Sequence, residues 1–255
     1  MKVLQNVKKK ENKTMKDAVK KILKLPVLQF MYEPVHKLYR LYSVPARRRR
    51  LKKYGPEVVK DLADVFRRWN IQAFAAYGTM LGFVRDSGFI PHDDDMDIGV
   101  MPGTISPQEL MRILLEKEKG FKLLFVFKYK EKVTEFKVEY KKIPIDFFFY
   151  EVKDGEFLSP LYFYIADKKY PSVNANSMKI VHLPPFKGIK WIDIFDCQFP
   201  VLDDSESALE ALYGKGWRVP DKKWSDAKRP HIVDVDDFGY SITLEEAYAL
   251  SDKKA

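Results

Sequence analysis

The hydrophobic pattern of the chain predicts that an α/β domain begins near residue 55. Apolar residues recur at helical spacing between residues 57 and 69, and Pro56 suits the first turn of such a helix. An apolar run at residues 72–77 predicts a short strand, and residues 80–85 predict a short helix after it. A helix, a strand and a second helix are therefore expected to open the domain.

The next part of the chain predicts strands with one helix among them. Residues 96–101 form an apolar strand, and a helix over residues 106–119 has Ser106 as its N-cap and Pro107 at its first position. We expect three further strands at residues 121–129, 132–140 and 143–152. In the second of these strands polar residues lie among the apolar ones, so one face is expected to be solvated or to line a cleft.

The remaining pattern is less regular. Residues 153–200 contain strand fragments broken by Pro and Gly, and their order does not follow from the pattern. Helical spacing returns at residues 205–213 and 244–250. Together these elements predict an α/β (α+β) fold.

The first 53 residues have a separate pattern, in which apolar residues at helical spacing lie opposite basic ones. The apolar positions are Met15, Ala18, Val19, Ile22, Leu23, Val35, Leu38, Tyr39 and Tyr42. Pro26 interrupts this pattern and Arg47 to Arg50 end it. We therefore expect a basic amphipathic segment at residues 1–53, a core at 54–200 and a C-terminal helical part of the same domain at 201–255.

The charge of the chain follows the same division. Residues 1–53 carry 17 Lys/Arg against 3 Asp/Glu, so the remainder holds 28 of the 45 basic and 33 of the 36 acidic residues. The net charge of +9 therefore belongs to the N-terminal segment, and no nucleic-acid partner is expected. A basic amphipathic segment suits an anionic membrane surface, and it equally suits a helix that packs on the body and exposes its lysines.

Compartment and membrane topology are constrained by two further features. The chain has a single cysteine, Cys197, which excludes a disulfide framework and suits a reducing compartment. The longest apolar runs are too short to cross a bilayer, and no secretory signal pattern is present. A cytoplasmic protein, peripheral at the inner face of a membrane, is the expected location.

Four aspartates are crowded directly before the strand at residues 96–101. Asp93, Asp94, Asp95 and Asp97 lie within five positions. Two such charges about 4 Å apart repel by roughly 4 kcal/mol at an effective dielectric near 20, so a cation is expected among them. The cluster is not an EF-hand, because Ile98 stands where that loop needs Gly. A metal site is favoured over a solvated acidic turn.

The residues before the cluster suggest what the metal does. Gly78 and Thr79 stand between a predicted strand and a helix, where backbone N–H groups and a hydroxyl can hold a phosphate. Arg85, at the end of that helix, suits a phosphate contact or a surface ion pair. Carboxylates beside a phosphate cradle indicate Mg²⁺ or Mn²⁺ with a nucleotide, and hence phosphoryl-group chemistry.

The run YGTMLGFVRDSGFIPHDDDMDIGV resembles the LicD/fukutin family, whose typical pattern is Tyr-Gly-Thr-Leu-Leu-Gly, a short arm and Ile-Pro-Trp-Asp-Asp-Asp-Ile-Asp-Ile-Gly. The resemblance covers residues 76–101, and a weaker one at residues 213–220, YGKGWRVP, matches Tyr-Gly-x-x-Trp-x-x-Pro. His92 departs from the usual Trp, and Phe83 and Met96 are milder departures. The change at His92 concerns the substrate pocket and leaves the acidic motif intact.

This resemblance implies a nucleotidyltransferase-like mixed sheet flanked by helices, with residues 54–200 as its catalytic core. It implies metal-dependent transfer of a phosphorylated small molecule, such as phosphocholine or a polyol phosphate, from a CDP-linked donor to a hydroxyl of a glycan or lipid-linked glycan. The family's Asp-x-Asp pair corresponds to Asp95 and Asp97, and its Gly-Thr pair to Gly78 and Thr79. Two alternatives stay open: transfer of a nucleoside monophosphate to a small molecule or protein, and an inactive binding protein of the same fold.

A third carboxylate is expected to complete the metal site, and two positions compete for it. Asp146 follows the predicted strands directly, whereas Asp193 lies in a later stretch, KWIDIFD. We favour Asp146 as the third metal ligand and as a participant in the chemistry. Tyr213 and Trp217 suit an aromatic frame for a nucleotide base or a choline-like head group, and the same spacing suits core residues.

Overall fold

The structure, a computed structural model, describes residues 32–163, 165, 168–221 and 231–250. Nine strands form one mixed sheet in the order β1-β2-β5-β4-β3-β11-β8-β7-β6. They are β1 (Ala73–Ala75), β2 (Met96–Val100), β3 (Lys122–Tyr129), β4 (Lys132–Tyr140), β5 (Ile143–Phe149), β6 (Glu151–Lys153), β7 (Glu156–Phe163), β8 (Ala175–Leu183) and β11 (Ile232–Ile242). The expected mixed sheet is confirmed, with β2 and β5 parallel and the other neighbours antiparallel.

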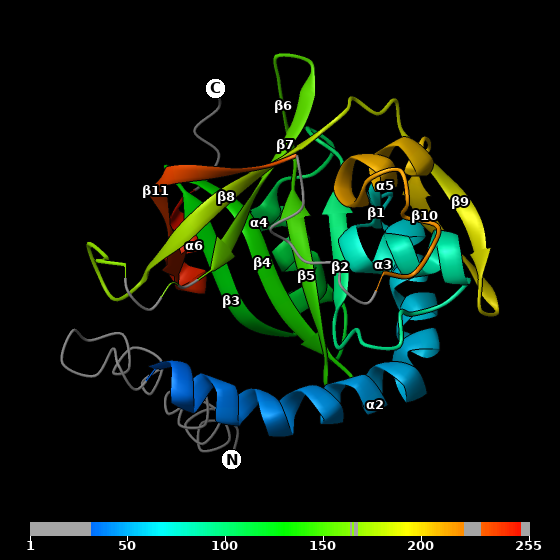
Figure 1. The fold of residues 1–255 in the computed structure, drawn as a ribbon, viewed down its shortest axis with the longest axis horizontal. Coiled ribbons are helices and arrows are strands. Elements are labelled where there is room, and N and C mark those ends of the chain that lie inside the picture. Colours follow the sequence, from blue (N-terminus) through cyan, green and yellow to red (C-terminus); the bar gives the residue numbers. More distant parts are fainter. Residues whose placement is uncertain (1–31, 164, 166–167, 222–230, 251–255) are drawn as a thin grey trace.

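Helices and a small second sheet surround this sheet (Figure 1). The second sheet pairs β9 (Ile189–Ile194) with β10 (Cys197–Leu202). The helices are α2 (Tyr32–Arg68), α3 (Tyr77–Leu81), α4 (Pro107–Arg112), α5 (Ser205–Tyr213) and α6 (Leu244–Ala249), with π-helical turns η2 (Gly82–Asp86) and η3 (Ile113–Lys117). Gln108 of α4 donates to the Ala247 and Leu250 carbonyls, so α4 and α6 lie side by side where they pack on β4 and β3.

The largest correction to the expected elements concerns α2. It runs unbroken from Tyr32 to Arg68 through Pro45 and Pro56, where the sequence predicted two helices with a boundary near residue 55. Tertiary packing explains the continuity, because Leu51 is buried and Gly55 lies against the Phe89 ring, closer than a Cβ would allow. The apolar positions predicted between residues 15 and 23 lie outside the described residues.

Two other elements differ from the expectation. Residues 201–255 supply a strand as well as helices, since β11 lies inside the main sheet between β3 and β8. Its sequence, IVDVDDFGYSI, carries three aspartates and does not alternate cleanly, so the hydrophobic pattern missed it. The stretch at 153–200 resolves into strands β6 to β10, which extend the main sheet and build the small one.

Strand β2 approaches β1 more closely than most side chains would permit. Phe74 pairs directly with Gly99, and a Cβ on Gly99 would lie 2.3 Å from the Phe74 ring. Both residues are buried, so neither can relax toward solvent. Gly99 therefore allows the strand that follows the acidic cluster to pack against β1.

The variant Gly99→Ala is expected to lose roughly 1–3 kcal/mol of unfolding free energy, because the added methyl group overpacks a closed site. Urea unfolding of the metal-free protein measures the loss. Gly188→Ala is the matched control, since a Cβ there meets nothing within 4 Å. Equal stability of Gly99→Ala and the control variant would contradict the packing described here.

Candidate active site

The sheet register places the predicted metal ligands on one face. Asp97 of β2 pairs with Asp146 of the parallel strand β5, and Asp146 pairs in turn with Lys137 of β4. Residues paired across neighbouring strands project to the same side of a sheet, so these three side chains share one face. Asp95 stands two residues before Asp97 and reaches the same group, because its carboxylate also contacts Lys137.

Lys137 lies at the centre of this group. Its Nζ is 2.5 Å from Asp146 Oδ2 and 3.4 Å from Asp95 Oδ2, and the side chain is 16% exposed. From sequence, Lys137 and Lys141 were residues that could meet a donor phosphate, although exposed lysines on a strand usually have no specific role. The structure makes Lys137 the cation that the aspartates share.

A fourth carboxylate was not anticipated. Glu135 lies two residues before Lys137 on β4, so it projects from the same face, and it is 6% exposed. Burial, followed by the charge of Asp146, holds the pKa of Glu135 well above its ordinary value. The alternation of β4 put Glu135 and Lys137 on one face, but it did not show that this face is buried.

The electrostatics indicate a surplus of negative charge. Burial, then the charges of Asp95 and Asp146, raise the pKa of Asp97 well above its ordinary value. Burial also raises the pKa of Asp146 to about 6, against the opposing effect of Lys137. For Lys137 burial lowers the pKa, but the carboxylates of Asp146 and Asp95 outweigh it and the net shift is upward. Lys137 is therefore charged, and one ammonium faces four carboxyl groups.

The chemistry of this group fits a divalent cation. All four carboxyl groups offer hard oxygen ligands of the kind that Mg²⁺ and Mn²⁺ prefer. Asp146 Oδ1 is buried and has no hydrogen-bond partner, which leaves an acceptor available. Among the described residues, no three acidic, His or Cys side chains already stand in a metal-binding arrangement. Asp95 and Asp146 are instead drawn to the Lys137 ammonium.

Gly78 and Thr79 lie beside the acidic residues, inside the first turn of α3 rather than in a turn before it. Thr79 Oγ1 accepts a 2.9 Å hydrogen bond from the Asp97 N–H, and a Cβ on Gly78 would lie 3.1 Å from Asp93 Oδ2. Tyr77, which begins the helix, has a φ of 42°, an uncommon conformation for a bulky residue. These contacts fix α3 against β2, and phosphate binding by Gly78 and Thr79 stays a prediction.

Arg85 connects the motif at residues 213–220 to the acidic residues. It pairs with Asp86 at 2.7 Å, as in the ion-pair alternative, and its Nη1 donates to the Trp217 carbonyl at 3.4 Å. Tyr213 and Asp93 both lie near enough to the Arg85 guanidinium to influence its pKa, so the motif at residues 213–220 lies near the acidic loop. Trp217 is 5% exposed and belongs to the core, although its buried indole N–H has no hydrogen-bond partner.

Helix α2 also reaches the acidic loop, which the sequence did not indicate. Arg47 Nη2 lies 2.5 Å from Asp94 Oδ2, and Arg48 Nε donates to the His92 carbonyl at 2.8 Å. The arginine run at the end of the basic segment thus packs partly on the body. At Arg47 and Arg48 this agrees with the alternative in which the basic segment is a helix that packs on the body.

Asp193, the competing third carboxylate, lies elsewhere. It is exposed on β9 in the small sheet, and its Oδ1 accepts a hydrogen bond from Gln198 Nε2 at 3.1 Å. The structure therefore brings Asp146, and not Asp193, next to Asp97.

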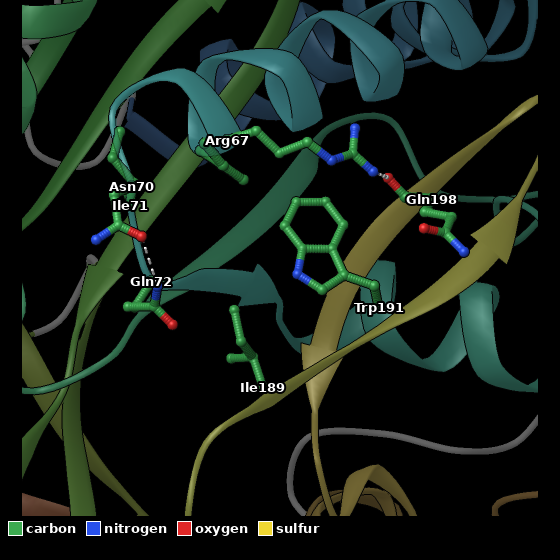
Figure 2. A pocket seen from close by; sticks show the side chains of 8 residues that line it. Arg67, Asn70, Ile71, Gln72, Ile189, Trp191 and Gln198 are labelled. Carbon is green, nitrogen blue, oxygen red and sulfur yellow. Dashed lines mark hydrogen bonds between the residues drawn. The ribbon is translucent and has the colours of Figure 1, made fainter.

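A cavity of about 530 Å³ lies at the other end of β1. Its lining residues are Phe66, Arg67, Asn70, Ile71, Gln72, Ile189, Trp191 and Gln198 (Figure 2). The Arg67 guanidinium lies 4.2 Å from the Trp191 ring centroid and donates to the Gln198 carbonyl at 3.4 Å. This contact joins α2 to the small sheet. The cavity holds none of the acidic residues described above, since Gln72 precedes β1 and the aspartates lie beyond its other end.

Comparison with known proteins finds a family model that matches the middle of the chain. Residues 70–190 match the family model LicD/FKTN/FKRP, nucleotidyltransferase domain. The ribitol-5-phosphate transferases FKTN of Mus musculus and Homo sapiens are 26% and 25% identical over 184 residues, 71% of this chain and 37% of theirs. An uncharacterized Caenorhabditis elegans protein, T07A5.1, is 38% identical over 74 residues, 28% of this chain and 19% of its own length. The chain thus matches little more than a third of each FKTN relative.

Among the described residues we find no helical segment that combines the length and the apolar character needed to cross a bilayer.

The stability of the metal-free protein is expected to fall with pH because of Asp93. Burial, then Asp95 and Asp94, raise the pKa of Asp93 to about 7 in the folded state, against about 3.9 in an unfolded chain. Between those values the folded state binds more protons at this residue than the unfolded state, so its contribution to stability declines as pH rises and then levels off. Asp93→Asn is expected to gain on the order of 1–2 kcal/mol over wild type between pH 5 and pH 8.

Urea unfolding at the two pH values in EDTA measures this gain. Asp154→Asn, at an exposed turn, is the control and should follow wild type. Parallel pH profiles for Asp93→Asn and wild type would show that Asp93 does not carry a raised pKa.

Proposed function

Residues 70–190 of this chain belong to the LicD/FKTN/FKRP family, and we propose that the protein is a transferase that moves a phosphate-linked group to a hydroxyl acceptor. The observation that carries this proposal is the partly buried carboxylate face formed by Asp95, Asp97 and Asp146. A surplus of buried negative charge is costly unless a cation neutralises it. Phosphoryl transfer is a reaction in which such a cation is useful.

In this proposal Asp95, Asp97 and Asp146 hold Mg²⁺ or Mn²⁺. The bound ion supplies charge neutralisation for a donor diphosphate and for the phosphoryl group in transfer. Gly78 and Arg85 lie near Asp93, Thr79 accepts a hydrogen bond from the Asp97 N–H, and these three residues contact donor phosphate oxygens. Tyr213, which is partly buried near Arg85, frames the base or the head group of the donor, while Trp217 supports this segment from the core.

The reaction balances without any further reactant. The acceptor oxygen forms a bond to the donor phosphorus, and the bond from that phosphorus to the bridging diphosphate oxygen breaks. The nucleoside monophosphate leaves with the bonding electrons. Asp146 takes the proton of the acceptor hydroxyl, since its Oδ1 has no hydrogen-bond partner among the residues that the structure describes and can accept it.

The donor is proposed to be CDP-linked, with a polyol phosphate or phosphocholine as the transferred group. The names of the FKTN relatives, ribitol-5-phosphate transferases, support the polyol. The acceptor is proposed to be a glycan, free or attached to a lipid. Transfer of the nucleoside monophosphate itself is the second candidate, because the matched family model is described as a nucleotidyltransferase domain. The mass of the product separates the two reactions.

The proposal also includes a membrane surface as a partner. On α2, Leu41 is 64% and Tyr42 76% exposed, and Lys37, Arg40 and Arg49 are exposed near them. Apolar side chains surrounded by basic ones suit the surface of an anionic bilayer. Such a surface would bring the site close to a lipid-linked acceptor.

Loss of either paired aspartate is expected to abolish transfer. Asp97→Asn and Asp146→Asn should each lower transfer from a CDP-linked donor by about a thousandfold, because each removes charge stabilisation from the reacting phosphoryl group. Mass spectrometry of the acceptor, with and without Mg²⁺, measures the yield. Asp193→Asn is the matched control and should retain activity, since Asp193 is exposed in the small sheet.

A thermal-shift series on the same variants provides an independent readout. A donor at about a hundred times its dissociation constant should stabilise wild type by roughly 2.7 kcal/mol in the presence of metal, and should not stabilise Asp97→Asn. Full metal-dependent transfer by Asp97→Asn would refute the proposed site. Stabilisation by ATP or UTP in place of CDP compounds would favour nucleotidyl transfer.

Binding to anionic membranes is expected to depend on the exposed apolar residues of α2. The double variant Leu41→Glu/Tyr42→Glu should co-sediment several-fold less than wild type with vesicles containing phosphatidylserine, since it adds repulsion and removes apolar contact. Val152→Glu, at an exposed apolar position on β6, is the control. Equal sedimentation with pure phosphatidylcholine vesicles, or no effect of the double variant, would contradict a role for α2.

A further inference from the structure

Lys137 stands where a cation bound by the carboxylates would stand. Its ammonium lies between Asp95 Oδ2, at 3.4 Å, and Asp146 Oδ2, at 2.5 Å. Glu135, two residues earlier on the same strand, is buried, and burial holds the pKa of its carboxyl group well above its ordinary value. An arginine of α2, Arg47, faces the neighbouring Asp94 and does not replace Lys137 in this contact.

This position follows from the sheet register and not from a chance surface contact. Lys137 and Asp146 are directly paired residues of β4 and β5, so the stems of both side chains leave the same point of the sheet. The lysine stem runs beside Phe125, its partner on β3, with Nζ 5.5 Å from that ring centroid. Lysine has a flexible four-carbon stem, so its ammonium can move by several ångströms while its Cα stays in the sheet.

The Lys137 ammonium and a divalent metal ion cannot both bind the same carboxylate oxygens closely. A divalent ion at Asp95 and Asp146 would stand close to the present Nζ position, and like charges about 4 Å apart repel strongly in a partly buried site. The ammonium must then leave these oxygens. The displaced ammonium then needs another negatively charged partner, and the phosphates of a bound donor can provide one.

We propose that Lys137 is a positioning residue that fills the cation position between Asp95 and Asp146 in the metal-free protein and turns to the donor phosphates when metal and donor bind together. This rests on the proposed metal-dependent function and extends it. Lys137 weakens metal binding when no donor is present and ceases to do so when donor phosphates accept its ammonium. Metal and donor therefore bind cooperatively, through a side chain and not only through direct contact.

The test is a Mn²⁺ titration of the full chain, followed by the electron paramagnetic resonance signal of free Mn²⁺, with and without CDP. Lys137→Met removes the charge and keeps a similar apolar stem. It is expected to bind Mn²⁺ about tenfold more tightly than wild type when CDP is absent, because the competing charge is gone. Added CDP should tighten Mn²⁺ binding to wild type by more than it does for the variant.

Two further variants serve as controls for the Mn²⁺ titration. Lys141→Met is the matched control, since Lys141 follows the end of the same strand and pairs with Asp61 and Glu57 outside the cluster; it should titrate like wild type. Lys137→Arg keeps the charge and should retain weak Mn²⁺ binding without CDP. If Lys137→Met does not fold, Lys137→Gln, which also removes the charge, replaces it and should show the same tighter Mn²⁺ binding without CDP.

The outcomes separate this inference from the function on which it rests. Mn²⁺ binding that is equal in wild type and Lys137→Met, or weaker in the variant, overturns the role of Lys137 and leaves the metal site in place. Wild-type Mn²⁺ binding that is unaffected by CDP also overturns the coupling. Absence of Mn²⁺ binding by every protein, with and without CDP, overturns the metal-dependent function and this role together.

Discussion

The parallel pairing of β2 with β5 is the constraint on which the rest of the site depends. It sets Asp97 beside Asp146, and the antiparallel pairing of β4 with β5 then sets Lys137 beside both. A slip of one residue in either pairing would turn these side chains to the opposite face of the sheet, where Ile98 and Phe136 are buried. The packing of the hydrophobic core therefore fixes the geometry of the charged face. Gly99 and Phe74 contribute by keeping β2 tight against β1.

Ion pairs and nearby charges link the carboxylate face to the neighbouring helices and loops. Asp93, Asp94 and Asp95 lie in the loop before β2, and cations from three different elements face them: Arg47 of α2, Arg85 of η2 and Lys137 of β4. Thr79 ties the start of α3 to the same strand through the Asp97 N–H. The basic N-terminal helix thus has two faces with different partners. Arg47 and Arg48 hold the acidic loop, while Leu41 and Tyr42 remain exposed.

Local signals in the sequence were sufficient for the elements that carry the chemistry. The strand after the four aspartates and the Ser106 cap both occur where the pattern placed them, because each depends on neighbours within a few residues. Asp146, and not Asp193, lies beside Asp97 because it belongs to β5, the strand that pairs with β2, and its role as a metal ligand stays a prediction.

Features that depend on contacts between residues distant in sequence could not be predicted from local sequence patterns. Glu135 and Lys137 looked like solvated residues of β4, and only the register with β5 shows that they are enclosed with Asp146. The same holds for Arg47, whose partner Asp94 is distant in sequence, and for β11, whose aspartates hide its place in the sheet. Helix α2 continues through Pro56 because Leu51 and Gly55 pack on the body, which local propensity does not reveal.

The central claim is that the face shared by β2, β5 and β4 binds a divalent cation. Anomalous diffraction from crystals grown with Mn²⁺ and CDP tests it most directly, because the manganese signal locates the ion without reference to activity. We expect a strong peak within coordination distance of Asp97 and Asp146, with the Lys137 ammonium displaced from Asp146. Manganese found only at exposed carboxylates, with Lys137 still on Asp146, would contradict it.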